Sequence, residues 1–505
     1  MPNPPSALRL QFADDMFLRR HDGDSSPAVN QVLWRLDGPY DADRLRDLAT
    51  GIAAGSLHRR VVRARVPGAR HRWAPAETLP VVDLQTTGVA EHEIGTWAQA
   101  QADLPLDPAG GRSWRLAAAD VVAADVVAAG AVSAGAVSAG AGGAAMNIVG
   151  GVLVAPGGAR PGGGQAAGAV VGAIVSLTCA HAVADGAALI DALVRASTHA
   201  DPIVVPASAR GTRALLSDAS DAARQAAAVA RWAQAKARQA ARTTQRAEPV
   251  VTAQRAEPVA APAPPVVQVT ATVTAPADDA AWRAPVLHVE LPADRVAKVA
   301  AEHGGTPNTW FVTFLARLVH ATGRFPGEPV PVALPVSTRG EDDPRANSTK
   351  VARVTIPADV LATRDLGWVR AAAKEAYTAV GQTGPGVAPV PLELVQMLPD
   401  TVVSRLPQPP VAAAMASNLG TPPPGYTHAP GGSVRAVATL SHYQGASATE
   451  LRAAGGGLVA FCTTVGQATV VSVAGLDPDR VADEAHLRHL VLSEADAWGL
   501  PAVPW

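Results

Sequence analysis

The side chains best suited to chemistry lie together near the middle of the chain, in the stretch HAVADG at residues 181–186. His181 carries an imidazole, whose ordinary pKa of about 6.5 suits a general base at neutral pH. Such a base needs one ring nitrogen unprotonated and aimed at a hydroxyl, while a backbone carbonyl could hold the other. Asp185 need not touch the ring, because it could equally tie the turn to an arginine. The spacing alone is weak evidence, since long chains often contain it by chance.

The flanking sequence strengthens the case by placing both residues on a turn between a strand and a helix. Residues 170–178 read VVGAIVSLT, a pattern typical of a buried strand. An apolar helical pattern starts directly after Asp185 and continues through Val194. Because α/β proteins commonly carry chemistry on such connections, we interpret His181 as a catalytic base rather than a structural histidine.

Other candidate sites are weaker. Cys179 lies two residues before His181 in an extended strand, too close for a nucleophile and its base to converge on one substrate, so we expect it to pack. His486 and His489 have helical spacing but no identifiable third ligand, and an exposed helix explains them. There is no GxSxG elbow, and no phosphate-loop lysine follows the glycines of residues 157–164. We therefore predict no metal site.

Composition narrows the class of protein. The length of 505 residues is enough for two or three domains, and the hydrophobic content of 48% is enough for a sizeable core. A formal net charge of −2 argues against a dedicated nucleic-acid binder. Two distant cysteines, Cys179 and Cys462, fit a reducing cytoplasm, and the N-terminus shows no signal-peptide pattern. The stretch 121–178 is too rich in alanine and glycine to favour a membrane span.

Periodicity and caps divide the chain into three regions: an N-terminal lobe over 1–204, a helix and Pro/Ala-rich linker over 205–285, and a C-terminal lobe over 286–505. In the first lobe we expect a strand over 31–36 and a helix capped by Asp41. A strand pair over 58–66 and 71–74 should be joined by a turn at Pro67-Gly68.

The repeats ADVVA and GAVSA follow, and with a glycine-rich piece they form a predicted insertion over about 117–168. We predict that residues 119–143 and 156–168 lack a fixed structure, because their small side chains bury too little area to offset the ordering entropy. Residues 213–242 predict a basic, alanine-rich surface helix, and the proline content of 243–285 indicates an extended linker.

The second lobe mixes strands and helices. Thr306-Pro307 should cap a helix that buries Trp310, Phe311, Phe314 and Leu318. We expect strands at 287–291, 329–336, 349–356, 411–417, 434–441, 457–463 and 467–473, and further helices at 294–302, 364–380 and 478–498. This alternation indicates α/β layers, in which parallel and antiparallel pairing both stay open.

HAVADG resembles the HxxxDG motif of the acyltransferase superfamily that includes chloramphenicol acetyltransferase, non-ribosomal peptide condensation domains and bacterial wax ester synthase/diacylglycerol acyltransferases. The last group, with the polyketide-associated acyltransferases, is the most similar. Further stretches resembling that group are Leu36-Asp37-Gly38-Pro39 with Asp41–Leu45, Thr306-Pro307-Asn308, Pro335-Val336-Ser337-Thr338-Arg339 with Asn347, and Ala416-Ser417-Asn418-Leu419-Gly420. The resemblance omits roughly 117–168 and 205–285. The chain departs from the group at Ala180, where an additional histidine is usual.

The resemblance implies an α/β fold of two chloramphenicol-acetyltransferase-like lobes with mixed sheets and a tunnel at their interface. His181 would lie in the tunnel, deprotonate the acceptor hydroxyl and then protonate the departing thiolate. Asp185 and Gly186 would be structural, with Arg339 as the partner of Asp185. Turn geometry also separates Asp185 from the ring of His181. Ser417 or Asn418 would contact substrate or donate to the oxyanion.

The implied activity is O-acyl transfer from a thioester to an alcohol, giving a lipid or wax-like ester from a long-chain acyl group. No cofactor is expected beyond the co-substrate, which is acyl-coenzyme A or an acyl-carrier thioester. The expected partners are a small-molecule acyl donor and an alcohol, and no nucleic acid. An acyl carrier protein and peripheral contact with a membrane stay open as further partners. Two alternatives stay open: a condensation-type enzyme that forms amides, and a non-catalytic binding relative.

Overall fold

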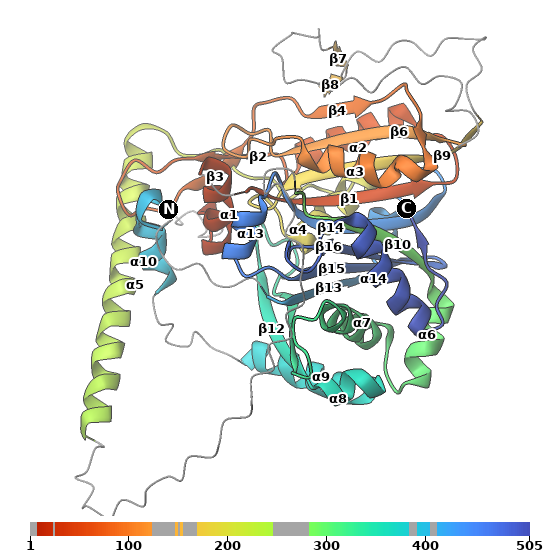
Figure 1. Ribbon diagram of the computed structural model, residues 1–505. Helices are drawn as coiled ribbons and strands as arrows, with labels where there is room; N and C mark the ends of the chain where they lie inside the picture. Colours follow the sequence, from red (N-terminus) through yellow and green to blue (C-terminus); the bar gives the residue numbers. More distant parts are fainter. Residues whose placement is uncertain are drawn as a thin grey trace, which may run out of the picture.

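Two sheets, each covered by helices, form two lobes stacked one above the other in the computed structural model (Figure 1). The structure describes residues 8–23, 26–123, 147–149, 152–154, 169–245, 282–382, 391–403 and 412–505. The first half of the chain contributes α1 (Phe12–Asp22), β1 (Ala28–Leu36), α2 (Ala42–Ala54), β2 (Arg59–Val62), β3 (Arg72–Pro75), β4 (Val81–Leu84), β5 (Val89–Ala90), the 3-10 helix η2 (Glu91–Glu93), α3 (Ile94–Asp103), β6 (Trp114–Val122), β7 (Asn147–Val149), β8 (Val152–Val154), β9 (Val170–Ala180), α4 (Gly186–Thr198) and α5 (Gly211–Gln245).

The second half contributes β10 (Val286–Pro292), α6 (Ala293–Glu302), α7 (Pro307–Ala321), β11 (Val330–Ser337), β12 (Thr349–Ile356), α8 (Ala358–Thr363), α9 (Leu366–Gln382), α10 (Leu392–Met397), α11 (Asp400–Val403), β13 (Ala414–Gly420), α12 (Pro424–Thr427), β14 (Val434–Tyr443), α13 (Ala448–Ala453), β15 (Leu458–Val465), β16 (Ala468–Gly475), α14 (Glu484–Ala497) and β17 (Val503–Pro504). The predicted elements are present, with ends that differ by a few residues.

Both sheets are mixed, as the predicted fold class requires. The first has the order β14-β1-β9-β6-β4-β8-β7, with β5 beside β6. Its strands β4 and β6 are parallel, whereas β1 and β9 are antiparallel. The second sheet has the order β12-β11-β13-β15-β16-β10-β17, in which β13 is parallel to both neighbours. A separate two-stranded ribbon, β2–β3, carries the predicted turn at Pro67-Gly68.

Local signals account for the helices that flank the site. The carboxylate of Asp41 accepts hydrogen bonds from the backbone at the start of α2, and Thr306 caps α7 with Pro307 in its first turn. α7 runs beneath the second sheet (Figure 1), where Trp310 and Phe314 are completely buried. These caps and this core were predicted correctly.

The boundary between the lobes differs from the predicted one, because β14 lies within residues 286–505 yet joins the first sheet. Nine of its ten residues pair antiparallel with β1, along the whole length of that strand. It also lies close to β15 and β16 of the second sheet. The C-terminal half of the chain therefore completes the first sheet and ties the two lobes together.

The predicted insertion also begins too early. Residues 117–122 form the second half of β6, where Ala119 is fully buried and Val121 is 3% exposed. Here the small side chains pack against neighbouring strands and α3 instead of standing alone. Residues 124–146, 150–151 and 155–168 lie outside the described residues, so the rest of that prediction stays a prediction. The short strands β7 and β8 pair within this region.

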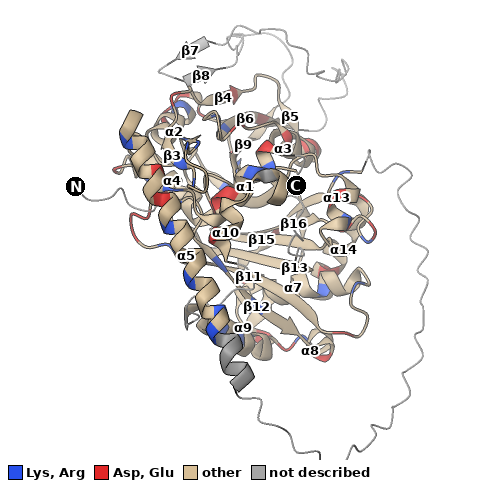
Figure 2. Ribbon diagram, turned by 90° about the vertical axis from the view of Figure 1, so that its left-hand side faces the viewer, with Lys and Arg blue, Asp and Glu red and all other residues tan. Residues whose placement is uncertain are grey.

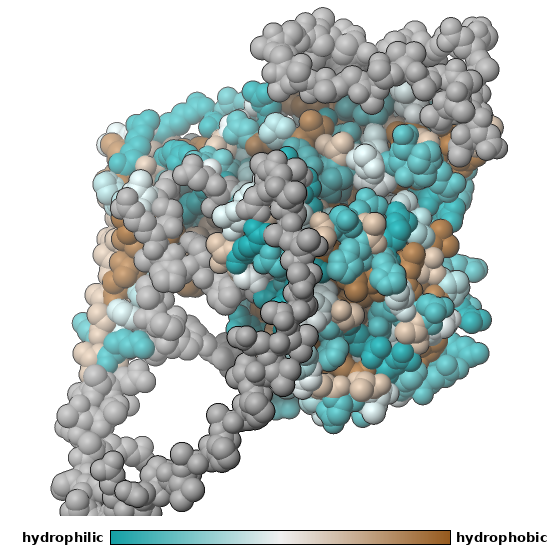
Figure 3. Space-filling model, in the orientation of Figure 1, coloured by the Kyte–Doolittle hydropathy of each residue, from teal (hydrophilic) through white to brown (hydrophobic). Residues whose placement is uncertain are grey.

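Helix α5 lies along the flank of the molecule and carries the basic residues visible in Figure 2. Two fully buried aspartates near its start, Asp218 and Asp221, hold it to the first lobe through Arg9 and Arg70. Residues 246–281 of the predicted linker lie outside the described part. Polar residues cover much of the face in Figure 3, with apolar ones scattered among them. Among the described helices, none combines the length and the apolar character of a membrane span.

Candidate active site

His181 follows the last residue of β9, a central strand of the first sheet. Its backbone N–H donates to the carbonyl of Ala28 at 2.9 Å, so sheet hydrogen bonding continues into the turn. The side-chain amide of Asn30 donates to the carbonyl of Ala184 at 2.8 Å and fixes the other end of the turn. The ring of His181 is therefore held at the end of a rigid strand and remains half-buried.

The second lobe supplies the other half of this site through residues 338–348, which connect β11 and β12 and are called here the crossing loop. The backbone N–H of Asp185 donates to the carbonyl of Ala346 in this loop at 3.0 Å. Asn347 and Ser348 of the loop are both buried. The candidate site thus lies where the two lobes meet.

Asp185 uses both carboxylate oxygens to join the lobes. Oδ1 accepts from the backbone N–H of Ala188, which caps α4, and from the guanidinium of Arg339 at 3.2 Å. Oδ2 accepts from the backbone N–H of Ser348 at 2.6 Å and from the hydroxyl of Thr349 at 3.0 Å. Arg339, the partner that we expected for Asp185, forms this ion pair. The ring of His181 bonds elsewhere, as the turn geometry predicted.

The hydrogen bonds of Asn347 determine which nitrogen of His181 carries the proton. Its Nδ2 donates to the carboxylate of Asp14 at 2.9 Å and to the carbonyl of His181 at 3.0 Å. Because both partners accept, the side-chain orientation of Asn347 is fixed. Its Oδ1 therefore faces Nδ1 of His181 at 3.1 Å and can only accept, so Nδ1 carries the proton. Nε2 is left with a free lone pair, as a general base requires.

Burial controls the charges around this network. Desolvation lowers the pKa of His181 below its ordinary value, and it raises the pKa of Asp14 to about 6. The ring of Phe17, from α1, stacks on that of His181 with centroids 3.9 Å apart and an interplanar angle of 22°. The fully buried guanidinium of Arg59 offsets part of the negative charge of Asp14. His181 is therefore neutral at neutral pH.

The pH dependence of activity should report this neutral base. We expect kcat/KM to be level at neutral pH and to fall only below about pH 6.5, because the lowered pKa of His181 moves its protonation to more acidic pH. Replacing Phe17 by Ala should admit water to one face of the ring, raise the pKa and move the acidic limb to higher pH. A profile whose acidic limb lies above pH 7 in the unmodified protein would contradict a neutral His181.

Ser417 and Asn418 lie in the middle of β13, and the described contacts do not join them to His181. Asn418 is exposed, donates to Asn308 at 2.9 Å and accepts from the backbone of Gly420.

Gly186 is the first residue of α4, and a Cβ there would meet no atom within 4 Å. Cys179 is fully buried, and desolvation raises the pKa of its thiol to about 12, which agrees with a packing role.

Sequence reasoning missed two contributors from α1, Asp14 and Phe17, and named Asn347 without a role. Asp14 and Phe17 are 167 and 164 residues from His181 in sequence, so no local spacing connects them to it. The available signal was an aspartate pair, Asp14-Asp15, directly before the apolar run Met16–Leu18. Only the fold shows that one acid of the pair is buried behind Asn347. The three best-defined pockets of the described residues are not lined by His181, so the predicted tunnel stays a prediction.

Comparison with protein-family models and with curated proteins finds no match. Among solved structures, the chain is similar to a wax ester synthase/diacylglycerol acyltransferase from Marinobacter aquaeolei VT8, with 11% identity, a TM-score of 0.48, and 97% of this chain and 99% of that chain covered. It is also similar to the first condensation domain of the CDA synthetase, with 15% identity, a TM-score of 0.48, and coverage of 97% and 95%. Polyketide synthase associated protein 5 from Mycobacterium tuberculosis gives 12% identity, a TM-score of 0.44, and coverage of 97% and 98%.

Proposed function

We propose that this protein transfers an acyl group from a thioester to an alcohol, with His181 as the general base. The observation that carries the proposal is the hydrogen bond from Nδ1 of His181 to Asn347, which leaves Nε2 as an acceptor. The lowered pKa keeps this nitrogen unprotonated at neutral pH. The resemblance of HAVADG and the flanking motifs to HxxxDG acyltransferases supplies the substrate class.

The reaction follows from one nitrogen that accepts and then returns a proton. Nε2 of His181 removes the proton of the acceptor hydroxyl while the oxygen of that hydroxyl attacks the thioester carbonyl. The tetrahedral oxyanion collapses, the carbon–sulfur bond breaks, and the imidazolium returns the proton to the departing thiolate. The products are an ester and a free thiol, so the histidine is regenerated without a cofactor. Asn347 holds the ring in the required tautomer throughout.

The remaining groups supply position and charge stabilisation. Asp185 and Arg339 hold the strand-to-helix turn against the second lobe, so that His181 keeps its place. Ser417 and Asn418 are our candidates for donating to the oxyanion, a contribution that can amount to several kcal/mol. The donor we propose is long-chain acyl-coenzyme A or an acyl-carrier thioester.

The direct test is incubation of the full chain with radiolabelled long-chain acyl-coenzyme A and a panel of alcohols and amines. We expect labelled ester and a stoichiometric release of thiol that depends on the alcohol. An amide product from the amines alone would favour the condensation-type reaction. A carrier-bound acyl thioester, tested in parallel, separates the two donors. Absence of product with every donor and acceptor would leave the non-catalytic alternative.

A further inference from the structure

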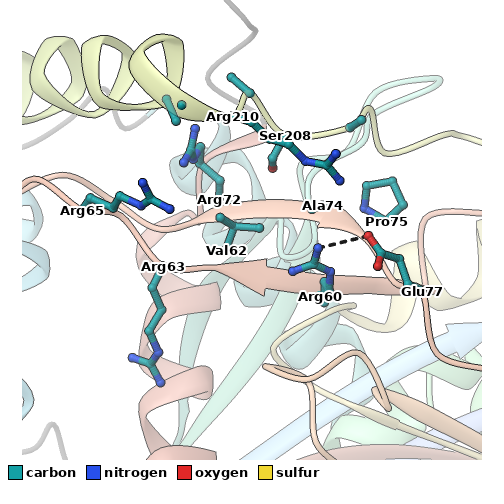
Figure 4. A pocket seen from close by; sticks show the side chains of 14 residues that line it. Arg60, Val62, Arg63, Arg65, Arg72, Ala74, Pro75, Glu77, Ser208 and Arg210 are labelled. Carbon is teal, nitrogen blue, oxygen red and sulfur yellow. Dashed lines mark hydrogen bonds and ion pairs between the residues drawn. The ribbon is translucent and has the colours of Figure 1, made fainter.

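A concave site lies apart from His181, between the ribbon β2–β3 and the segment that leads into α5 (Figure 4). The pocket has a volume of about 410 Å³, within the range of small-molecule sites. Five arginines and one acid line it, together with small residues: Arg60, Arg63, Arg65, Arg72, Arg210 and Glu77. The opposite face of β3 carries Trp73, which donates to Asp14, so the ribbon separates this pocket from the network of His181. We call it the arginine pocket.

The acids near the arginine pocket do not balance its cations. Arg60 pairs with Glu77 at 3.3 Å, but the Glu77 side chain is 75% exposed, and such pairs are weak. Arg63 pairs with Asp22 at 2.6 Å, and Figure 4 shows its side chain pointing away from the others. Arg65 and Arg210 are exposed, and neither has an ion pair within the described residues. A net positive charge therefore remains at the pocket.

Arg72 shows that this excess extends into the protein. Arg72 is only 7% exposed, and its Nε has no hydrogen-bond partner among the described residues. Its nearest carboxylate, Asp218, lies 3.7 Å away and already accepts from Arg9 at 2.8 Å and from the backbone N–H of Arg65 at 2.9 Å. One buried carboxylate is thus shared by two guanidinium groups. A desolvated cation with an incomplete partner set is stabilised by an added anion.

The start of α5 adds to the attraction for an anion. Gly211, the first residue of this 35-residue helix, lines the arginine pocket and has φ 58°, a value that favours glycine. The first turn of a helix directs unpaired N–H groups and the positive end of the helix dipole outward. Arginine, helix amides and concave shape together match a ligand with several negatively charged oxygens.

We propose that the arginine pocket binds a phosphate-bearing small molecule. Phosphate fits better than a single carboxylate, because planar guanidinium groups from several elements can each donate hydrogen bonds to two phosphate oxygens. The volume leaves space for more than one phosphate group or for the organic part of a phosphate ester. Free pyrophosphate and the nucleotide end of coenzyme A present the same chemistry. The proposal stands on these contacts and does not depend on the reaction at His181.

Titration calorimetry of the full chain, without any acyl acceptor, tests the arginine pocket with three probes: pyrophosphate, coenzyme A and 3′-dephospho-coenzyme A. We expect binding that weakens as salt rises, because exposed charges contribute to it. The double variant Arg65→Gln/Arg210→Gln should weaken binding by about tenfold or more, since hydrogen bonds to charged groups are lost. Both side chains are exposed, so the variant should remain folded.

The matched control is Arg231→Gln/Arg238→Gln, which removes the same charge from exposed positions further along α5. Its affinity should stay within about twofold of the unmodified protein, since surface charges at a distance are screened. Binding of pyrophosphate as well as coenzyme A would identify the phosphates as sufficient. Binding of coenzyme A without binding of pyrophosphate would show that the pocket also needs the organic part of the ligand. No binding of any probe, or equal weakening by both double variants, would overturn the proposal.

Discussion

Replacing His181 by alanine should lower turnover by about 10²–10⁴-fold, the usual contribution of a general base. The reason is geometric, because Asn347 occupies Nδ1 and leaves Nε2 as the nitrogen that can take a proton. The same substitution should leave the protein folded. It deletes one hydrogen bond and a ring stacked on Phe17, while the backbone N–H that continues the sheet is kept. Oδ1 of Asn347 would lose a partner, at a cost of about 1–3 kcal/mol.

The control is His489→Ala, which removes an exposed histidine from α14. Turnover of this variant should match that of the unmodified protein. Steady-state kinetics of both variants, with thermal unfolding and near-ultraviolet circular dichroism, separates loss of the base from loss of the fold. If His181→Ala is folded and turns over at the unmodified rate, the residue is not the base.

Local patterns determine much of this fold and half of the site. Asp41, Asp185 and Thr306 are caps whose effect is complete within a few residues, so the helices that follow them could be placed from sequence. The strand before His181 was equally visible, because it is a long apolar run. The pairing of Asp185 with Arg339 needed more than local pattern, since 154 residues separate the two. The resemblance, together with the need of a shielded carboxylate for a cation, supplied it.

Pairing between distant segments explains what sequence reasoning missed. The apolar run of β14 would suit an edge of either sheet, and only the register with β1 shows that it joins the first. Asp14 has no local feature that marks it as buried, because its burial depends on Asn347 and Trp73 from other elements. Ala119 and Val121 belong to a repeat that cannot order itself alone. Neighbouring strands supply the packing that orders them.

Asp185→Asn should cost about 3–5 kcal/mol of unfolding free energy, because it removes one member of a shielded ion pair. The side chains of Asp185 and Arg339 are only 4% and 9% exposed. Water therefore cannot solvate the guanidinium of Arg339 once the carboxylate is removed. Nε of Arg339 already lacks a hydrogen-bond partner among the described residues, which makes the remaining interactions of its guanidinium more important. The new amide would also present donors where Ser348 N–H and Thr349 now donate. At most one oxygen of asparagine could serve the four donors that meet Asp185.

The matched control is Asp483→Asn, the same substitution at the N-cap of α14. The side chain of Asp483 is exposed and accepts from the backbone of His486, a role that asparagine fills about equally well. Its unfolding free energy should therefore stay within about 0.5 kcal/mol of the unmodified value. Denaturant unfolding of both variants gives the comparison. Asp185→Asn should also lose activity, because the turn that holds His181 loses the carboxylate contacts with Arg339, Ser348 and Thr349. Equal stability of the two variants would mean that the ion pair with Arg339 contributes nothing net to holding the lobes together at this site.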